Sequence, residues 1–214
     1  MLCLQIASCL AITVIVLKSI NMLVNDYLLI IEPSNDVKEK VNALKKSFAE
    51  KYECTQALHS KPHLTLLRFM QYDMNERNIV RKLELLVNQY AAFMVLLNDF
   101  GSFPTHTIYV NVETKNNIVD LVKSLKPAQA FLKYDKEHKP HFITTPHITI
   151  ARKLLPWQYE KGWLELSNTH FNASFMVSNI LLLKRNIEQK HYTLAATFEL
   201  MGKKEVLMEQ VSLF

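Results

Sequence analysis

Two copies of one short pattern most constrain how this chain can fold. KPHLTLLRF at residues 61–69 and TPHITIA at residues 145–151 each place a proline, a histidine and a threonine inside an aliphatic run. Successive side chains of a β-strand point to opposite faces, so histidine and threonine share one face and the aliphatic residues share the other. Proline keeps the residue before it extended and cannot donate to a strand ladder. Each copy therefore predicts a half-buried strand that begins close to its histidine.

The remaining histidines do not extend this pattern. HYTL at residues 191–194 also fits His-x-Thr but lacks the proline, and short motifs match by chance. We therefore interpret His191 as a polar residue near the C-terminal end of the domain. The other histidines have no comparable partner and no metal-ligand spacing such as HExxH; they are His59, His106, His138, His141 and His170. We expect no metal site and no cofactor.

Composition limits the class of protein. The chain has 214 residues, 49% of them hydrophobic, which is enough for one sizeable domain or two joined lobes. Its three cysteines, Cys3, Cys9 and Cys54, form no disulfide framework, which suits a reducing compartment. A net charge of +5 fits an anionic partner such as RNA or a nucleotide.

The N-terminal segment is almost wholly apolar between residues 2 and 17. It is shorter than the roughly 20 residues of a membrane-spanning helix, and no basic residue precedes it as in a signal peptide. Two interpretations stay open: a short membrane anchor, or an upstream extension before a true start at Met22, which we prefer. We divide the chain into an apolar extension, 1–25, and a single two-lobed domain, 26–214. We expect a cytoplasmic protein that acts as a monomer, with membrane anchoring as the alternative.

Periodicity predicts alternating strands and helices. A buried strand at 27–31 precedes a helix that Ser34 or Asn35 caps. The apolar stripe of this helix comprises Val37, Val41, Leu44 and Phe48. Its lysines, Lys38, Lys45 and Lys46, are expected to point away from that stripe.

The rest of the chain repeats this alternation. A second helix opens at Asn75, with a stripe of Ile79, Leu83, Leu86 and Tyr90. FGSFP is interpreted as a turn between strands 93–97 and 107–112. A third helix carries Ile118, Leu121, Val122 and Leu125, and further elements are a helix at 157–166 and two final strands at 175–184 and 192–200. Each half then contributes one histidine strand, which predicts an α+β sandwich with a pseudo-repeat.

HLTL at 63–66 and HITI at 147–150 resemble the paired signatures of the 2H phosphoesterase superfamily, in particular its 2′-5′ RNA ligase and cyclic phosphodiesterase branch. FGSFPTHTIYVNV and ILLLKRNIEQKHY resemble further segments of that family, so the resemblance covers roughly residues 26–200. It implies two pseudo-symmetric lobes of antiparallel sheet with outer helices and a central cleft where the motifs face each other. It also implies metal-independent action on 2′,3′-cyclic phosphates or 2′-5′ linkages of RNA ends or nucleotides.

Histidine and threonine suit this chemistry. A histidine with an ordinary pKa near 6.5 can act as a general base or a general acid at neutral pH, so His63 and His147 are the candidate catalytic residues. Thr65 and Thr149 can donate hydrogen bonds to phosphate oxygens. Arg152 resembles a family arginine that holds phosphate or ribose. The sequence leaves base and acid unassigned, with a slight preference for His147 as the base toward water.

Two details of this interpretation stay open. Arg68, at the end of the first motif, either reaches the cleft or does not. A non-catalytic nucleotide-binding or RNA-binding module on the same fold is the alternative to an enzyme.

Overall fold

The structure is a computed structural model that describes residues 23–203. The expectations for the apolar segment at 2–17, and for a start at Met22, lie outside the described residues. Within residues 23–203 no helix has both the length and the hydropathy needed to span a membrane.

Strands form the centre of the molecule and helices flank them. The strands are β1 (Val24–Ile31), β2 (Leu64–Tyr72), β3 (Phe93–Phe103), β4 (Thr107–Val112), β5 (His141–Phe142), β6 (His147–Arg152), β7 (Asn172–Val177), β8 (Asn179–Asn186) and β9 (Thr193–Glu199). The helices are α2 (Asn35–Lys51), α3 (Glu76–Val87), α4 (Lys115–Ser124), α5 (Gln129–Leu132) and α6 (Pro156–Leu166), with 3₁₀ turns at Thr55–His59, Asp73–Asn75 and Lys126–Ala128.

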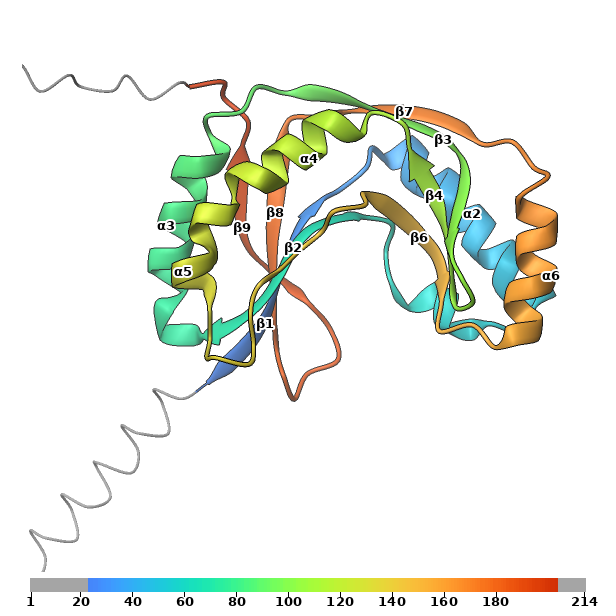
Figure 1. Ribbon diagram of the computed structural model, residues 1–214, viewed down its shortest axis with the longest axis horizontal. Coiled ribbons are helices and arrows are strands. Elements are labelled where there is room, and N and C mark those ends of the chain that lie inside the picture. Colours follow the sequence, from blue (N-terminus) through green and yellow to red (C-terminus); the bar gives the residue numbers. More distant parts are fainter. Residues whose placement is uncertain (1–22, 204–214) are drawn as a thin grey trace, which may run out of the picture.

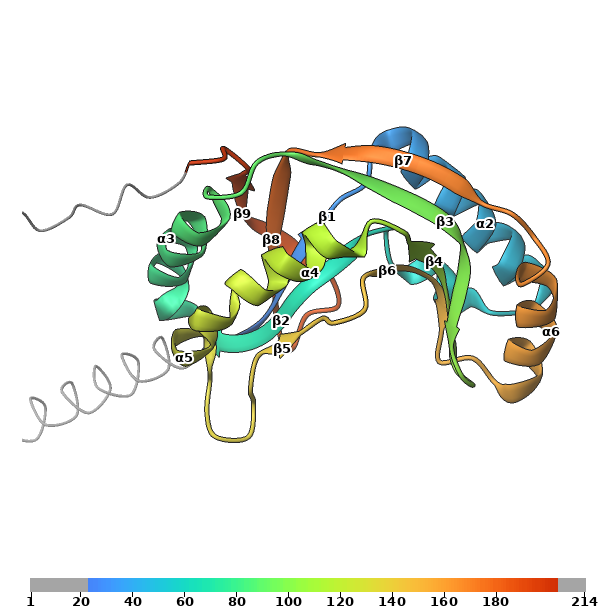
Figure 2. The ribbon, with the colours of Figure 1, turned by 45° about the horizontal axis from the view of Figure 1, so that its top comes forward.

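One antiparallel sheet runs through the whole described fold in the order β7-β3-β4-β6-β2-β1-β8-β9, with the short β5 beside β2. We call β7, β3, β4 and β6 the β4 half and β2, β1, β8 and β9 the β1 half. Helices α2 and α6 lie against the β4 half, whereas α3, α4 and α5 lie against the β1 half (Figures 1 and 2). The α+β prediction of two lobes with outer helices is confirmed.

The two halves repeat one another and exchange helices. The order β1-α2-β2-α3 recurs as β4-α4-β6-α6, with α5 and the short β5 inserted between α4 and β6. Helix α2 follows β1 but packs against β6 of the other half, and α4 follows β4 but packs against β2. This exchange ties the halves together, and it places β2 and β6, the two histidine strands, side by side at the centre of the sheet.

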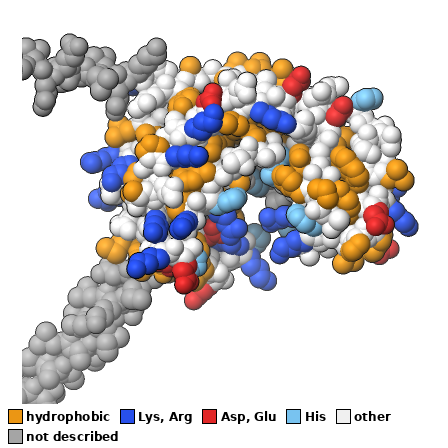
Figure 3. Space-filling view, in the orientation of Figure 1, with side chains coloured by type: hydrophobic (Ala, Val, Ile, Leu, Met, Phe, Trp, Pro, Cys, Tyr) orange, Lys and Arg blue, Asp and Glu red, His pale blue; other side chains and the backbone are white. Residues whose placement is uncertain are grey.

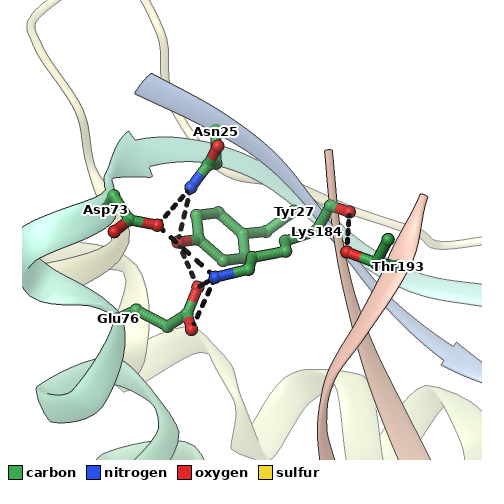
Figure 4. A network of polar contacts seen from close by, with 6 residues as sticks. All are labelled: Asn25, Tyr27, Asp73, Glu76, Lys184 and Thr193. Atoms are coloured by element: carbon green, nitrogen blue, oxygen red, sulfur yellow. Dashed lines mark hydrogen bonds and ion pairs between the residues drawn. The ribbon is translucent and has the colours of Figure 1, made fainter. Parts of the chain in front are cut away.

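The core lies between the sheet and its helices. Leu64 and Leu66 of β2 and Ile148 and Ile150 of β6 are 1% exposed or less, as the aliphatic face of each motif predicts. A network of polar side chains holds the start of α3 against strands β1 and β8 (Figure 4). It contains the hydrogen bonds Tyr27 Oη to Glu76 (2.9 Å) and Asn25 Nδ2 to Asp73 (2.8 Å) and the ion pair of Lys184 Nζ with Glu76 (2.8 Å). Burial raises the pKa of Tyr27, and its bond to Glu76 adds to that rise, so the phenol stays protonated and can donate.

Two predicted strand boundaries are wrong. FGSFP is not a turn, because β3 continues to Phe103 and Gly101 and Ser102 pair with Tyr109 and Ile108. The predicted strand at 175–184 is two strands separated by Ser178, since β7 pairs with β3 in one half and β8 pairs with β1 in the other. A single strand cannot serve opposite ends of the sheet.

Two predicted helix faces also differ. Helix α3 ends at Val87, which is buried, so Tyr90 lies beyond it and donates its backbone N–H to the Val87 carbonyl. Lys45 does not point away from the core of α2, since its side chain is 1% exposed. The residues Val37, Val41, Lys45 and Ala49 follow one another at intervals of four and form a single buried row.

Candidate active site

The two His-x-Thr motifs meet where the halves of the sheet join. Leu64 of β2 pairs with Ile148 of β6, and this is the single residue pair between these strands. Extending the antiparallel register by one residue each way sets His63 opposite Thr149 and Thr65 opposite His147. Since all four alternate with core residues, they share the sheet face away from the helices. Figure 3 shows the molecule hollowed between its halves, with basic side chains along the walls of the hollow.

Both histidine rings are oriented in the same way. Nδ1 of His63 lies 2.8 Å from the Lys61 carbonyl oxygen, and Nδ1 of His147 lies 2.7 Å from the Thr145 carbonyl oxygen. A carbonyl oxygen only accepts, so each Nδ1 carries the proton and each neutral ring has its free electron pair on Nε2. The intervening Pro62 and Pro146 are buried. The repeated proline therefore fixes the position of the carbonyl two residues before each histidine. That carbonyl in turn selects the histidine tautomer with the proton on Nδ1.

A β-bulge in each half brings an arginine to the same face. The register of β2 against β1 shifts between Thr65 and Leu67, and that of β6 against β4 shifts between Thr149 and Ala151. Each shift turns the side chain five residues after the histidine toward the face of the threonine. Arg68 and Arg152 are therefore equivalent positions of the repeat, and Arg68 lies on the same sheet face as Thr65.

Arg68 and Arg152 differ in whether the guanidinium group is already held in an ion pair. Arg68 forms a bidentate ion pair with Asp26 of β1, at 2.8 and 2.9 Å. Arg185 Nη2 and Tyr192 Oη bond the same carboxylate, which is 3% exposed. Burial alone raises the pKa of Asp26, but these hydrogen bonds and charges lower it overall, so the carboxylate stays ionised. Arg152 is exposed and forms no ion pair with any residue of the described chain.

Aromatic rings surround His147. The Phe103 ring meets it edge-on with centroids 5.1 Å apart, and the Tyr109 ring lies 4.9 Å away. Burial lowers the pKa of His147, against the opposing effect of its bond to Thr145. A Cβ atom at Gly101 would lie 2.4 Å from the Tyr109 ring, so glycine is needed there for Tyr109 to lie across β3 beside His147.

Cations surround His63. Burial lowers its pKa most, the hydrogen bond to Lys61 raises it, and the charges of Lys45 and Arg152 lower it again. No carboxylate among the described residues offsets these charges at either histidine. The neutral form of His63 is therefore favoured in the free protein. The slight preference for His147 as the base leaves His63 as the acid, and this electrostatic setting opposes that role unless a bound anion restores the proton of His63.

The other histidines belong to neither His-x-Thr strand pair at this junction; His141 of β5 pairs with Arg68 of β2. His191 is exposed in the connection between β8 and β9, at the outer end of the β1 half. His106 bonds Thr107, and His138 and His170 pair with Asp135 and Asp99. No group of three or more metal-ligating side chains occurs among residues 23–203. Sequence reasoning missed Lys45, although the four-residue spacing from Val41 could have found it.

Comparison with known sequences assigns the family. The sequence model of the 2′-5′ RNA ligase superfamily matches residues 33–188, a range that includes both motif strands. The chain belongs to the 2′-5′ RNA ligase superfamily. The family resemblance that HLTL and HITI carry is thereby confirmed.

Two relatives match this chain over most of their length. A protein of Oceanobacillus iheyensis named "Putative phosphoesterase OB1230" is 28% identical over 177 residues, which cover 81% of this chain and 97% of that protein. "Putative phosphoesterase GK0864" of Geobacillus kaustophilus is 26% identical over 185 residues, covering 84% and 99%. The likeness thus extends well beyond the two motifs.

Solved structures share the fold. TT0787 of Thermus thermophilus superimposes with a TM-score of 0.61 at 18% identity, covering 84% of this chain and all of that chain. E. coli LigT, crystallised with 3′-AMP, has a TM-score of 0.55 at 14% identity, covering 83% and 98%. These similarities show that the chain shares its fold with both structures.

Proposed function

We propose that this protein is a metal-independent phosphoesterase that opens a 2′,3′-cyclic phosphate or a 2′-5′ linkage at an RNA end or in a nucleotide. The observation that carries the proposal is the pairing of Leu64 with Ile148, which sets two oriented histidines and two threonines on one face. Nucleotide recognition is further supported by LigT, a protein of the same fold that was crystallised with 3′-AMP.

The chemistry needs one proton acceptor and one proton donor. One histidine Nε2 takes a proton from water as the water oxygen attacks phosphorus. The other histidine gives a proton to the ribose oxygen as the ring P–O bond breaks. When this reaction runs backward, the ribose oxygen closes the ring and water leaves, so the two histidines exchange roles.

The phosphate is held by donors of the protein itself. Thr65 and Thr149 carry hydroxyls on the reacting face, and Arg152 adds a cation without an ion-pair partner in the described chain. Hydrogen bonds and charge directed at the phosphate oxygens stabilise the negative charge that grows in the transition state. These groups supply the stabilisation that a metal ion provides in other phosphoesterases.

The test is hydrolysis of a 2′,3′-cyclic nucleotide, and of an RNA that ends in one, in the presence of EDTA. We expect turnover by the wild type and a loss of at least about 100-fold in kcat for His63→Ala and His147→Ala. His191→Ala is the matched control, because it removes a histidine from a third His-x-Thr match, and it should retain full activity.

Other outcomes would change the assignment. Activity that EDTA abolishes would contradict metal independence. If nucleotide binds to the wild type and to both histidine variants without turnover, the protein is a binding module on this fold. Turnover that survives both substitutions would place the reaction elsewhere in the molecule.

A further inference from the structure

Helix α2 buries a lysine with no acidic partner. Lys45 is 1% exposed, and no carboxylate of the described chain lies within ion-pair distance of its Nζ atom. Nζ instead donates to the carbonyl oxygen of Ser60 and to its Oγ atom at 3.2 Å. Burying an ammonium group without a counterion is costly, so a lysine at such a position calls for a role that an apolar residue could not fill.

Ser60 connects this lysine to His63. Residues 60–63 lead from the 3₁₀ turn at Thr55–His59 into β2, and the Lys61 carbonyl within them accepts the Nδ1 proton of His63. Lys45 therefore anchors the start of the segment whose second carbonyl orients the ring. The corresponding helix of the other half, α4, buries only apolar residues, namely Ile118, Leu121 and Val122. The anchor is thus specific to His63.

The charge of Lys45 acts on the same site. Burial, with a contribution from the positive Arg152, lowers the pKa of Lys45 to about 8. At neutral pH it is therefore still mostly protonated. The charged groups in its reach are Arg152 from β6 and His63 before β2, and no acidic group of the described chain offsets them. These cations therefore lack a counterion among the described residues.

We propose that Lys45 is a positioning residue of this site, which holds residues 60–63 so that His63 faces the substrate and adds its positive charge to that of Arg152 in attracting the phosphate. This inference rests on the proposed function for the identity of the anion as a phosphate ester. The ammonium group of Lys45 does not touch the reacting atoms. It acts through its hydrogen bonds to Ser60 and through its positive electrostatic potential.

The experiment compares three single variants with the wild type. Lys45→Met removes the charge and keeps the length of the side chain. Lys45→Arg keeps the charge. Lys46→Met is the matched control, because Lys46 is the next residue of the same helix but is exposed and pairs only with Glu50. For each protein, NMR titration of the imidazole signals reports the pKa values of His63 and His147, and calorimetry reports the affinity for inorganic phosphate.

We expect Lys45→Met to raise the pKa of His63 toward 6.5, to move that of His147 less, and to weaken phosphate binding at pH 7 by about tenfold. Lys45→Arg should keep the pKa of His63 low, and Lys46→Met should match the wild type in both measurements. A His63 pKa and a phosphate affinity that stay unchanged in folded Lys45→Met would overturn the proposal.

A second comparison does not depend on Lys45→Met being folded. Lys45 loses its proton near pH 8, whereas an arginine stays charged. The ratio of phosphate affinities, Lys45→Arg over wild type, should therefore rise about fivefold from pH 7 to pH 9. A constant ratio would count against a charged role for Lys45.

These readouts separate this inference from the proposed function, since neither needs turnover. A wild type that binds phosphate and responds to Lys45→Met, yet hydrolyses no cyclic phosphate, would refute the proposed reaction alone. Metal-free hydrolysis with kcat/KM unaffected by Lys45→Met would refute the role of Lys45 alone.

Discussion

At the scale of single residues, the two histidines are matched in geometry but differ in charge environment. Both donate Nδ1–H to the carbonyl two residues earlier, and burial lowers the pKa of both. Only His63 also faces two cations, Lys45 and Arg152. The pair can therefore hold a single proton only at a pH below the ordinary histidine pKa of 6.5, unless an anion is bound.

This difference predicts the pH dependence of the reaction. The value of kcat/KM follows the ionisation of the free enzyme, which must carry one neutral and one protonated histidine. Because both pKa values are lowered, kcat/KM for a 2′,3′-cyclic nucleotide should peak below pH 6.5 and fall by up to tenfold per pH unit above the peak. The peak of kcat should lie at higher pH, since the bound phosphate favours the imidazolium form. Steady-state rates from pH 5 to 9 measure both, and a kcat/KM that rises to a plateau above pH 8 would contradict this.

The candidate residues were visible in the sequence where a local rule marks them. Proline before His-x-Thr predicts both the strand start and the shared face, and the structure places His63, Thr65, His147 and Thr149 together at one junction. For Lys45 the one local signal is its four-residue spacing from Val41, and the usual behaviour of lysine speaks against burial. A helix lysine is ordinarily solvated, and its burial depends on a contact with Ser60, which lies outside α2.

At the scale of elements, the packing of β3 against β4 depends on one glycine. Gly101 of β3 pairs with Tyr109 of β4, and the Tyr109 ring occupies the space where a Cβ atom at position 101 would lie. The same ring contacts His147. The FGSFP segment therefore forms a strand that leaves room for an aromatic residue beside the candidate active site.

Gly101→Ala should for this reason damage both stability and activity. The new Cβ must displace the Tyr109 ring, and overpacking of this kind costs about 1–3 kcal/mol. A displaced ring also frees His147, so kcat/KM should fall. Tyr109→Leu in the Gly101→Ala background removes the clash, and the double variant should unfold at nearly the same temperature as Tyr109→Leu alone. If the two single effects on thermal unfolding add, the ring and the glycine are not coupled as the geometry indicates.

Sequence periodicity predicted every helix of eight residues or more in the described chain, and most strands. It did not predict which strands belong to which half of the sheet. Aliphatic alternation continues from Phe175 to Lys184 without a proline or glycine to mark the break at Ser178. The break arises because β7 and β8 find partners in different halves of the sheet, which is a property of the assembled fold. The two-residue β5 is too short for any periodicity, so it could not be predicted.

At the scale of the whole molecule, the halves share a core but divide their charges unequally. The β1 half neutralises Arg68 with Asp26, whereas the β4 half leaves Arg152 without an ion pair in the described chain and has the buried Lys45 beside it. A binding site for an anion forms where positive charge is left uncompensated. That surplus reduces the stability of the free protein, as expected for a group retained for function rather than for folding.

The cost of Lys45 should be measurable as a dependence of stability on pH. Its pKa is about 8 in the folded protein, against 10.5 for an ordinary lysine, so the unfolded chain binds the proton more tightly. The penalty is fully present below pH 8 and disappears above pH 10.5, and it amounts to about 3 kcal/mol. The difference in free energy of unfolding between wild type and Lys45→Met should therefore move in favour of the wild type by about 2 kcal/mol from pH 7 to pH 10, because the other titrating groups cancel between the two proteins. Urea denaturation of both proteins at these pH values measures the difference, with Lys46→Met as the control that should show no such trend. A difference independent of pH would mean that Lys45 has an ordinary pKa. Its charge would then be compensated in the free protein, and there would be no need for a phosphate to act as its counterion.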